Sequence, residues 1–186
     1  ISNNQISFIE KYSFKDLINL IELDLNDNHL FKLNLKLFEN LLSIRIIKLN
    51  YNQFKTIDTN LLFKNQNQLK ELHLANNLIE KLVIKRNLLP NLTYLDLSNN
   101  ILLKLFENEN SNLEYLNLEN CYRLEYSKSI NNFKDLKSAL LVGLNENFLK
   151  NLDFSNYRKL SVLDLSYNNL SVIKSNSLYF LSNIIE

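Results

Sequence analysis

The sequence predicts an α/β repeat solenoid, in which short parallel strands lie side by side along the chain. The first observation is a leucine pattern ending in one asparagine, which returns about every 24 residues through all 186 residues. The second is the alternation of apolar and polar residues inside each copy, typical of a short strand with one buried face. Because the copies recur at nearly constant spacing, we expect their strands to form one parallel sheet, about 4.8 Å apart.

The clearest copies lie at residues 69–79 and 92–102, and both follow the pattern LxxLxLxxNxL. Three further copies keep its apolar and asparagine positions: Leu20, Leu23, Leu25, Asn28 and Leu30; Ile44, Ile47, Leu49, Asn52 and Phe54; Leu160, Leu163, Leu165, Asn168 and Leu170. This pattern resembles the leucine-rich-repeat family. The resemblance implies a horseshoe with a parallel β-sheet on its concave face and irregular or short helical segments on its convex face.

Two copies fit the pattern less well. In the copy that begins at Leu113, Cys121 takes the asparagine position. The next copy favours a register in which Ala139, Val142 and Leu144 are buried and Asn147 takes the asparagine position. A competing register instead buries Leu136, Ala139 and Leu141. Both registers remain open from the sequence alone.

The whole chain, residues 1–186, is expected to form a single solenoid of about seven full repeats with partial repeats at both ends, an uncapped fragment of a longer protein. Phe14 and Phe38 occupy matching places after the asparagine and are expected to fill the core. This spacing of phenylalanine and leucine is similar to the typical, 24-residue class of animal extracellular leucine-rich-repeat proteins, such as Toll-like, chaoptin-like and Slit-like ectodomains.

The recurring asparagine is expected to have a structural role. It stands where the chain leaves the strand and buries backbone groups that no neighbouring strand can pair, and its amide offers two donors and one acceptor. We expect an internal ladder that links adjacent repeats and is made of Asn28, Asn52, Asn77, Asn100, Asn147 and Asn168, with Asn4 at its start.

Composition limits the classes of function. The formal charge is +1 and basic and acidic residues are mixed along the repeats, so nucleic acid is not an expected partner. No apolar run approaches the roughly 20 residues that span a bilayer, so no direct membrane insertion by this segment is expected. Asn91 and Asn169 begin N-glycosylation sequons, although an asparagine-rich chain contains such triplets by chance.

The solvent-facing strand positions are the expected site of partner binding. Tyr94 and Tyr115 occupy equivalent places on adjacent strands, and the favoured register continues this column with Leu141 and Val162 into an apolar ridge. Tyrosines at such places are common interface anchors. The alternative is that the two rings merely stack on each other, a favourable cross-strand pair that needs no ligand.

Neighbouring polar positions complete the candidate surface: Lys48, Glu71, His73 and Asp96. A metal or acid–base site at His73 is possible chemically, but an open sheet lacks the converging geometry that such sites need, so a solvated charge cluster is expected. Cys121 is expected to be a buried structural thiol. We therefore expect no catalytic residue, metal or cofactor, and no enzyme activity in this segment.

The leading interpretation is a recognition module that binds a protein ligand or co-receptor, or a glycan, as part of the ectodomain of a cell-surface or secreted receptor or adhesion protein. Dimerisation is compatible with this interpretation. The alternative is an intracellular, cytoplasmic adaptor or scaffold, or a surface protein of a microbe or protist. Caps, a signal peptide and a membrane span in the full reading frame discriminate between these interpretations.

Overall fold

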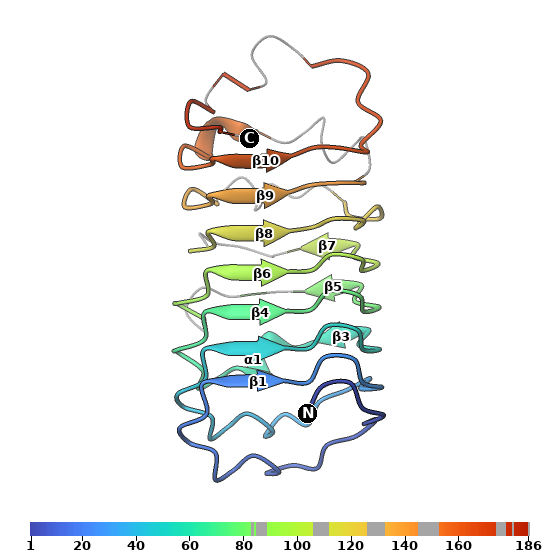
Figure 1. The fold of residues 1–186 in the computed structure, drawn as a ribbon, viewed down its shortest axis with the longest axis vertical. Helices are drawn as coiled ribbons and strands as arrows, with labels where there is room; N and C mark the ends of the chain where they lie inside the picture. Colours follow the sequence, from blue (N-terminus) through green and yellow to red (C-terminus); the bar gives the residue numbers. More distant parts are fainter. Residues whose placement is uncertain are drawn as a thin grey trace.

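The computed structural model describes residues 1–82, 84, 89–105, 112–125, 133–144, 153–173, 178–179 and 181–185. Its main feature is a parallel sheet of seven three-residue strands stacked along the long axis of the molecule (Figure 1). In sheet order the strands are β1 (Glu22–Asp24), β2 (Ile46–Lys48), β4 (Glu71–His73), β6 (Tyr94–Asp96), β8 (Tyr115–Asn117), β9 (Ser138–Leu140) and β10 (Val162–Asp164). Each turn of the solenoid thus contributes one strand, which confirms the predicted fold class.

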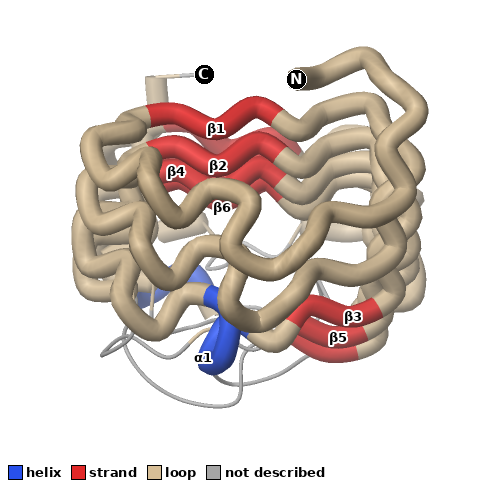
Figure 2. Tube along the Cα trace, turned by 90° about the horizontal axis from the view of Figure 1, so that it is seen from below, coloured by secondary structure: helices blue, strands red, loops and turns tan. Residues whose placement is uncertain are grey.

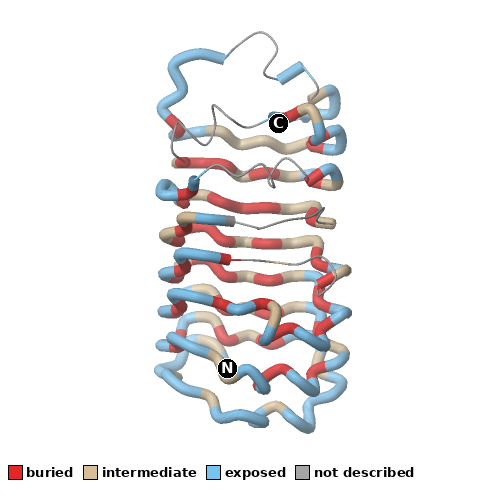
Figure 3. Tube along the Cα trace, turned by 180° about the vertical axis from the view of Figure 1, so that it is seen from behind, coloured by how far each residue is buried: buried red, intermediate tan, exposed pale blue. Residues whose placement is uncertain are grey.

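The central residue of each strand points into the core and the two flanking residues point outward. Leu23 pairs with Ile47, and Ile47 pairs with Leu72, so equivalent apolar positions lie side by side through the stack. Ile47 and Leu72 are completely buried. Buried segments recur in successive coils (Figure 3), and their apolar side chains form one core cluster. No coil could bury these side chains alone, and stacking supplies the missing neighbours.

A second, three-stranded parallel sheet lies across the core from the first (Figure 2). It consists of β3 (Thr56–Ile57), β5 (Lys81–Leu82) and β7 (Lys104–Leu105). The family resemblance implies irregular or short helical segments here, and the repeat pattern does not predict this sheet. Strands of two residues are too short to show an alternating pattern, because only one side chain of each can turn inward.

The helical content is small. Helix α1 (Thr59–Leu62) begins at Asp58, whose side chain accepts hydrogen bonds from the backbone N–H groups of Asn60 and Leu61. A 3₁₀ turn, η2 (Phe154–Asn156), begins in the same way at Asp153. Phe38 is fully buried and stacks on Phe63 with ring centroids 5.6 Å apart, whereas Phe14 is only partly buried.

The favoured register of the copy after Cys121 is wrong. Ala139 pairs with Leu116 on one side and with Leu163 on the other, so Leu136, Ala139 and Leu141 are the inward positions. Leu144 therefore occupies the asparagine position and is buried. Asn147, which the favoured register placed there, lies outside the described residues.

The physical reason for this register is the turn after the strand. In every described coil the residue before the asparagine position adopts a left-handed backbone, with φ between 54° and 61° from Asp27 to Gly143. The observed register gives this position to Gly143, the residue that adopts positive φ without steric cost. The favoured register would have placed Gly143 inside the strand, where fixing a glycine backbone costs more conformational entropy than fixing any other residue.

The asparagines bridge adjacent coils. Asn52 donates from Nδ2 to the backbone carbonyl oxygens of Leu25 (3.0 Å), Leu49 (3.3 Å) and Asn50 (3.1 Å), and its Oδ1 accepts from the Leu30 N–H at 3.0 Å. Asn28, Asn77 and Asn100 form the same set of contacts, and Asn168 bonds the carbonyl of Leu141 and the N–H of Leu144.

Candidate partner-binding site

The solvent-facing side of the seven-stranded sheet, here called the sheet face, carries two columns of side chains. The first strand positions form the column Glu22, Ile46, Glu71, Tyr94, Tyr115, Ser138 and Val162. The third positions form the column Asp24, Lys48, His73, Asp96, Asn117, Leu140 and Asp164. These two columns contain the side chains that a partner approaching the sheet would meet.

The predicted apolar ridge requires a correction. Leu141 does not belong to it, because the observed register turns this side chain inward and leaves it 4% exposed. Ser138 stands in its place between Tyr115 and Val162. Leu140 takes the place in the column of third strand positions that the favoured register gives to Gly143. A small side chain therefore borders the tyrosines where the favoured register predicts a leucine.

Three aromatic side chains from β4, β6 and β8 meet on the sheet face, and we call them the aromatic shelf: His73, Tyr94 and Tyr115. The two tyrosine rings are stacked, with centroids 4.2 Å apart and an interplanar angle of 2°. The His73 ring lies 4.6 Å from that of Tyr94, tilted by 32°. The alternative of mutual ring stacking is thus realised geometrically, while both tyrosines keep partial exposure to solvent.

Partial burial extends the pH range in which both phenols are neutral. Desolvation raises the pKa of Tyr94 well above its ordinary value, and the nearby Tyr115 and Asp96 add to this shift. Desolvation is also the largest cause of the raised pKa of Tyr115. The shelf therefore offers neutral rings with hydroxyl groups that can donate, a combination suited to interfaces that are apolar at one end and wet at the other.

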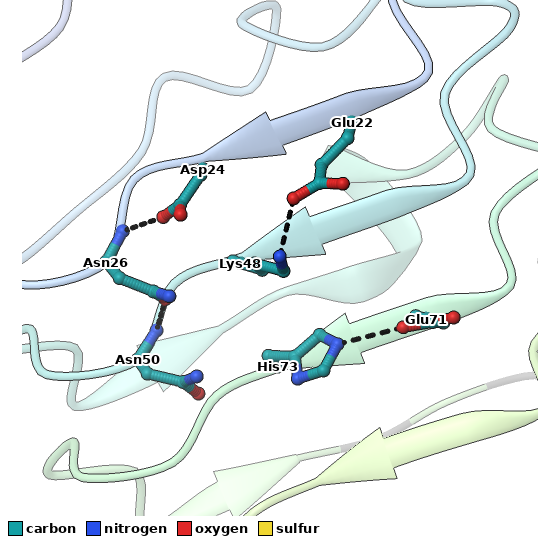
Figure 4. Close-up of polar contacts among 7 residues, drawn as sticks. All are labelled: Glu22, Asp24, Asn26, Lys48, Asn50, Glu71 and His73. Carbon is teal, nitrogen blue, oxygen red and sulfur yellow. Dashed lines mark hydrogen bonds and ion pairs between the residues drawn. The ribbon is translucent and has the colours of Figure 1, made fainter. Parts of the chain in front are cut away.

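Two side-chain pairs lie on the sheet face at and near the shelf (Figure 4). His73 Nε2 lies 3.1 Å from Glu71 Oε2, and Lys48 forms an ion pair with Glu22 on the preceding strand. Both pairs are partly exposed, so each contributes little to stability. Among the residues that the structure describes, no three His, Cys, Asp or Glu side chains are grouped in a way that could hold a metal ion.

Several outward polar residues serve the backbone of the strand exits. Asp96 Oδ1 accepts from the Ser98 N–H at 3.0 Å and from Ser98 Oγ at 2.8 Å, and Asp24 accepts from the Asn26 N–H. Asn26 Oδ1 in turn accepts from the Asn50 N–H at 2.7 Å (Figure 4). These residues close turns and link coils, a role that the repeat pattern does not predict.

Cys121 occupies the asparagine position of its coil and is fully buried. Its Sγ lies 3.2 Å from the carbonyl oxygen of Leu97, to which the thiol donates. Burial raises the pKa of the thiol to about 12, so the reactive thiolate is strongly disfavoured.

The two sequon asparagines are both exposed. Asn91 donates from Nδ2 to the carbonyl oxygen of Asn67 at 2.7 Å. Asn169 follows the ladder residue Asn168 in a left-handed conformation, with φ 52°. In the described part of the chain, no helix is long and apolar enough to cross a membrane.

Comparison with known protein families finds matches to leucine-rich-repeat models. Leucine-rich-repeat models match residues 1–54 and residues 91–110 and 159–181. No curated protein matches the chain.

Among solved structures, the leucine-rich repeat domain of APL1B superposes with a TM-score of 0.75 at 22% identity, over 99% of this chain and 53% of that one. The functional domain of InlJ from Listeria monocytogenes, which includes a cysteine ladder, superposes with a TM-score of 0.72 at 20% identity, over 98% of this chain and 36% of that one. TLR13 in a complex with ssRNA13 superposes with a TM-score of 0.60 at 27% identity, over 97% of this chain and 23% of that one. The chain spans only part of each of these proteins. By its repeat models and its shared fold, the chain belongs to the leucine-rich-repeat family, whose domains are typical protein-interaction modules.

Proposed function

We propose that this chain is a recognition module that binds a protein ligand through the aromatic shelf. The observation that carries the proposal is the pair of stacked, partly exposed tyrosines near the middle of the seven-stranded sheet, bordered by the small side chain of Ser138. Stacking fixes both rings before a partner arrives, so little side-chain freedom is lost on binding. Aromatic anchors of this kind carry much of the binding energy at protein interfaces.

The charge of the sheet face indicates the chemistry of the partner. Its two columns contain five carboxylates and one lysine, namely Glu22, Asp24, Glu71, Asp96 and Asp164 against Lys48. We therefore propose a ligand that presents an arginine or lysine beside an apolar side chain. An arginine could stack on the Tyr115 ring while its charge faces the carboxylates. The proposed binding set is Lys48, Glu71, His73, Tyr94, Asp96, Tyr115 and Val162.

The screen that tests this proposal uses the intact chain as bait against an array of protein ectodomains, followed by titration of each protein found. Tyr94→Ala and Tyr115→Ala are each expected to weaken binding by about tenfold or more, as for interface anchors. Tyr167→Ala is the matched control, because Tyr167 is 89% exposed and lies outside both columns.

Thermal melts of the same variants separate binding from stacking. Variants that lose stability but keep full affinity would assign the tyrosines to mutual stacking alone. A glycan or a single-stranded RNA that bound through the shelf in place of any protein would contradict the proposed ligand class. A protein hit whose affinity falls only with Tyr167→Ala would move the site elsewhere.

We further propose an extracellular location, as part of a receptor or adhesion ectodomain. The support is the resemblance of the Phe14 and Phe38 spacing to the typical extracellular class, together with exposed sequons at Asn91 and Asn169. Sequencing the complete transcript tests this location. A signal peptide and cysteine-rich caps would support it, whereas their absence from the full reading frame would favour a cytoplasmic adaptor or scaffold.

A further inference from the structure

A second surface, independent of the sheet face, lies between the first two coils. It is an open groove of about 480 Å³, lined by Phe8, Lys11, Tyr12, Lys32, Leu33, Asn34, Leu35 and Lys36. Lys32 and Leu33 follow Asn28 at the same offset at which Thr56 and Ile57 of β3 follow Asn52. The groove therefore belongs to the wall on which β3, β5 and β7 lie, across the core from the aromatic shelf.

The groove is lined by three lysines and by no acidic side chain. The ion pairs found among the described residues involve Lys48, His73, Lys137 and Lys159, and none of them includes a groove lysine. Glu39 acts on Lys36 electrostatically, but none of the three lysines is within ion-pair distance of a carboxylate that the structure describes. The three positive charges therefore create a local field that attracts anions, even though the whole chain has a formal charge of only +1.

Aromatic rings hold these lysines in place. The ammonium nitrogens of Lys11 and Lys36 lie 5.5 Å and 5.7 Å from the centroid of the Tyr12 ring, and Lys36 Nζ donates to the Tyr12 hydroxyl at 3.2 Å. Lys32 is placed in the same way over Phe31, at 5.5 Å. Tyr12 itself has φ 67°, an uncommon backbone conformation for a bulky residue. Tyr12 thus contacts two of the three groove lysines.

Bulky apolar side chains accompany the charges. Phe8 is 55% exposed and Leu35 is 51% exposed. Large apolar side chains that stay exposed beside a groove often indicate a binding surface. A ligand that satisfies both features needs several negative groups and a weakly polar face that can rest on a ring.

From this combination we propose that the groove binds a sulfated polysaccharide chain. Its sulfate groups would meet the ammonium groups of Lys11, Lys32 and Lys36, and a pyranose ring would place its C–H face on Phe8. Lysine is a mobile point charge, suited to sulfates whose positions vary along a chain, whereas arginine is the residue of choice for nucleic-acid recognition and is missing from the lining. Single-stranded nucleic acid stacks successive bases on several rings, whereas the rings of Tyr12 and Phe31 already carry ammonium groups and leave Phe8 as the open ring of the groove.

The test is a titration of the full chain with a defined heparin oligosaccharide, with chemically desulfated heparin as the comparison ligand. Binding of the sulfated form is expected to weaken steeply with salt. The double variant Lys32→Ala/Lys36→Ala is expected to lower the affinity at least about tenfold, since two charged contacts are lost. The matched control, Lys137→Ala/Lys159→Ala, removes two exposed lysines in the coils of β9 and β10 and is expected to change the affinity less than about twofold.

A second variant tests the ring contact. Phe8→Ala is expected to weaken heparin binding several-fold while leaving its salt dependence unchanged, because no charge is removed. Equal affinity of the groove and control double variants would overturn the proposal, as would equal binding of desulfated heparin. Tighter binding to polyuridylate or to phosphatidylserine vesicles than to heparin, lost with Lys32→Ala/Lys36→Ala, would reassign the groove to another polyanion. None of these outcomes depends on the aromatic shelf.

Discussion

The coils from Asn28 to Asn100 and the two coils that follow them satisfy the buried backbone groups of the same turn in different ways. In the first region, each buried asparagine bonds both its own coil and its neighbour. In the second region, Cys121 and Leu144 stand at the equivalent positions, and neither can replace the amide. Cys121 keeps one S–H contact to the carbonyl of Leu97, and its N–H turns back to the Leu118 carbonyl of its own coil at 3.1 Å.

A backbone ladder nevertheless continues through both regions. The N–H of the left-handed residue in each coil donates to a carbonyl oxygen of the next coil. The pairs are Asp27 to Asn50, Tyr51 to Ala75, Asn76 to Ser98, Asn99 to Glu119, Asn120 to Val142 and Gly143 to Ser166. The left-handed turn therefore maintains the stack, while the asparagine amide satisfies the remaining backbone groups that the turn buries.

The largest expected effect breaks this amide layer in the regular region. Asn77→Leu removes hydrogen bonds to the carbonyl oxygens of Leu49 and Leu74 and leaves the buried Phe54 N–H without its acceptor. We expect a loss of about 3 kcal/mol in the free energy of unfolding. Urea unfolding measures it, with the exposed Asn67→Leu as the control, expected to change stability by less than about 0.5 kcal/mol. An unchanged midpoint for Asn77→Leu would show that the backbone ladder suffices alone.

Much of this architecture could be predicted from the sequence because the leucine spacing repeats. The inward positions of β1, β2, β4, β6, β8 and β10 all follow from it. The register of β9 did not, since residues 139–144 are nearly all apolar and hydrophobicity alone fits two registers. Gly143 was the signal that could have decided it, because one position in every described coil requires a positive φ.

The candidate sites also differ in how far the repeat pattern predicts them. The neighbouring strand positions of Tyr94 and Tyr115 could be predicted from equivalent places in two copies. The contact between His73 and Tyr94 could not, since it joins different columns and depends on side-chain rotamers. The groove around Tyr12 was also missed, because its residues lie in segments where the repeat pattern constrains little beyond the core positions.

A smaller effect is expected where the left-handed turn itself is changed. Gly143→Ala forces a side chain into φ 61°, and its Cβ would lie 2.7 Å from Asn120 Oδ1. We expect a loss of about 1–2 kcal/mol, measured by urea unfolding. Adding Asn120→Gly removes the clashing oxygen at a position that also has positive φ, so the double variant should recover part of the loss. No loss in Gly143→Ala would argue that this coil can abandon the left-handed turn.

The smallest expected effect, and the only one with the opposite sign, comes from making the irregular region more like the regular one. Cys121→Asn places an amide beside the carbonyl oxygens of Leu97 and Leu118. In the regular coils, the asparagine amide donates to the two equivalent carbonyl oxygens, which are those of Leu74 and Leu97 for Asn100. If the side chain is the main difference between the regions, the free energy of unfolding should rise by about 1 kcal/mol. Cys121→Ser is the control, since its hydroxyl has one donor and is too short to reach the neighbouring groups that the carbonyl and the second N–H of an amide would contact. If Cys121→Asn lowers the free energy of unfolding while Cys121→Ser leaves it unchanged, the two regions differ in their backbone. The hydrogen bond from the N–H of residue 121 to the Leu118 carbonyl would then occupy the acceptor and the space that the amide needs.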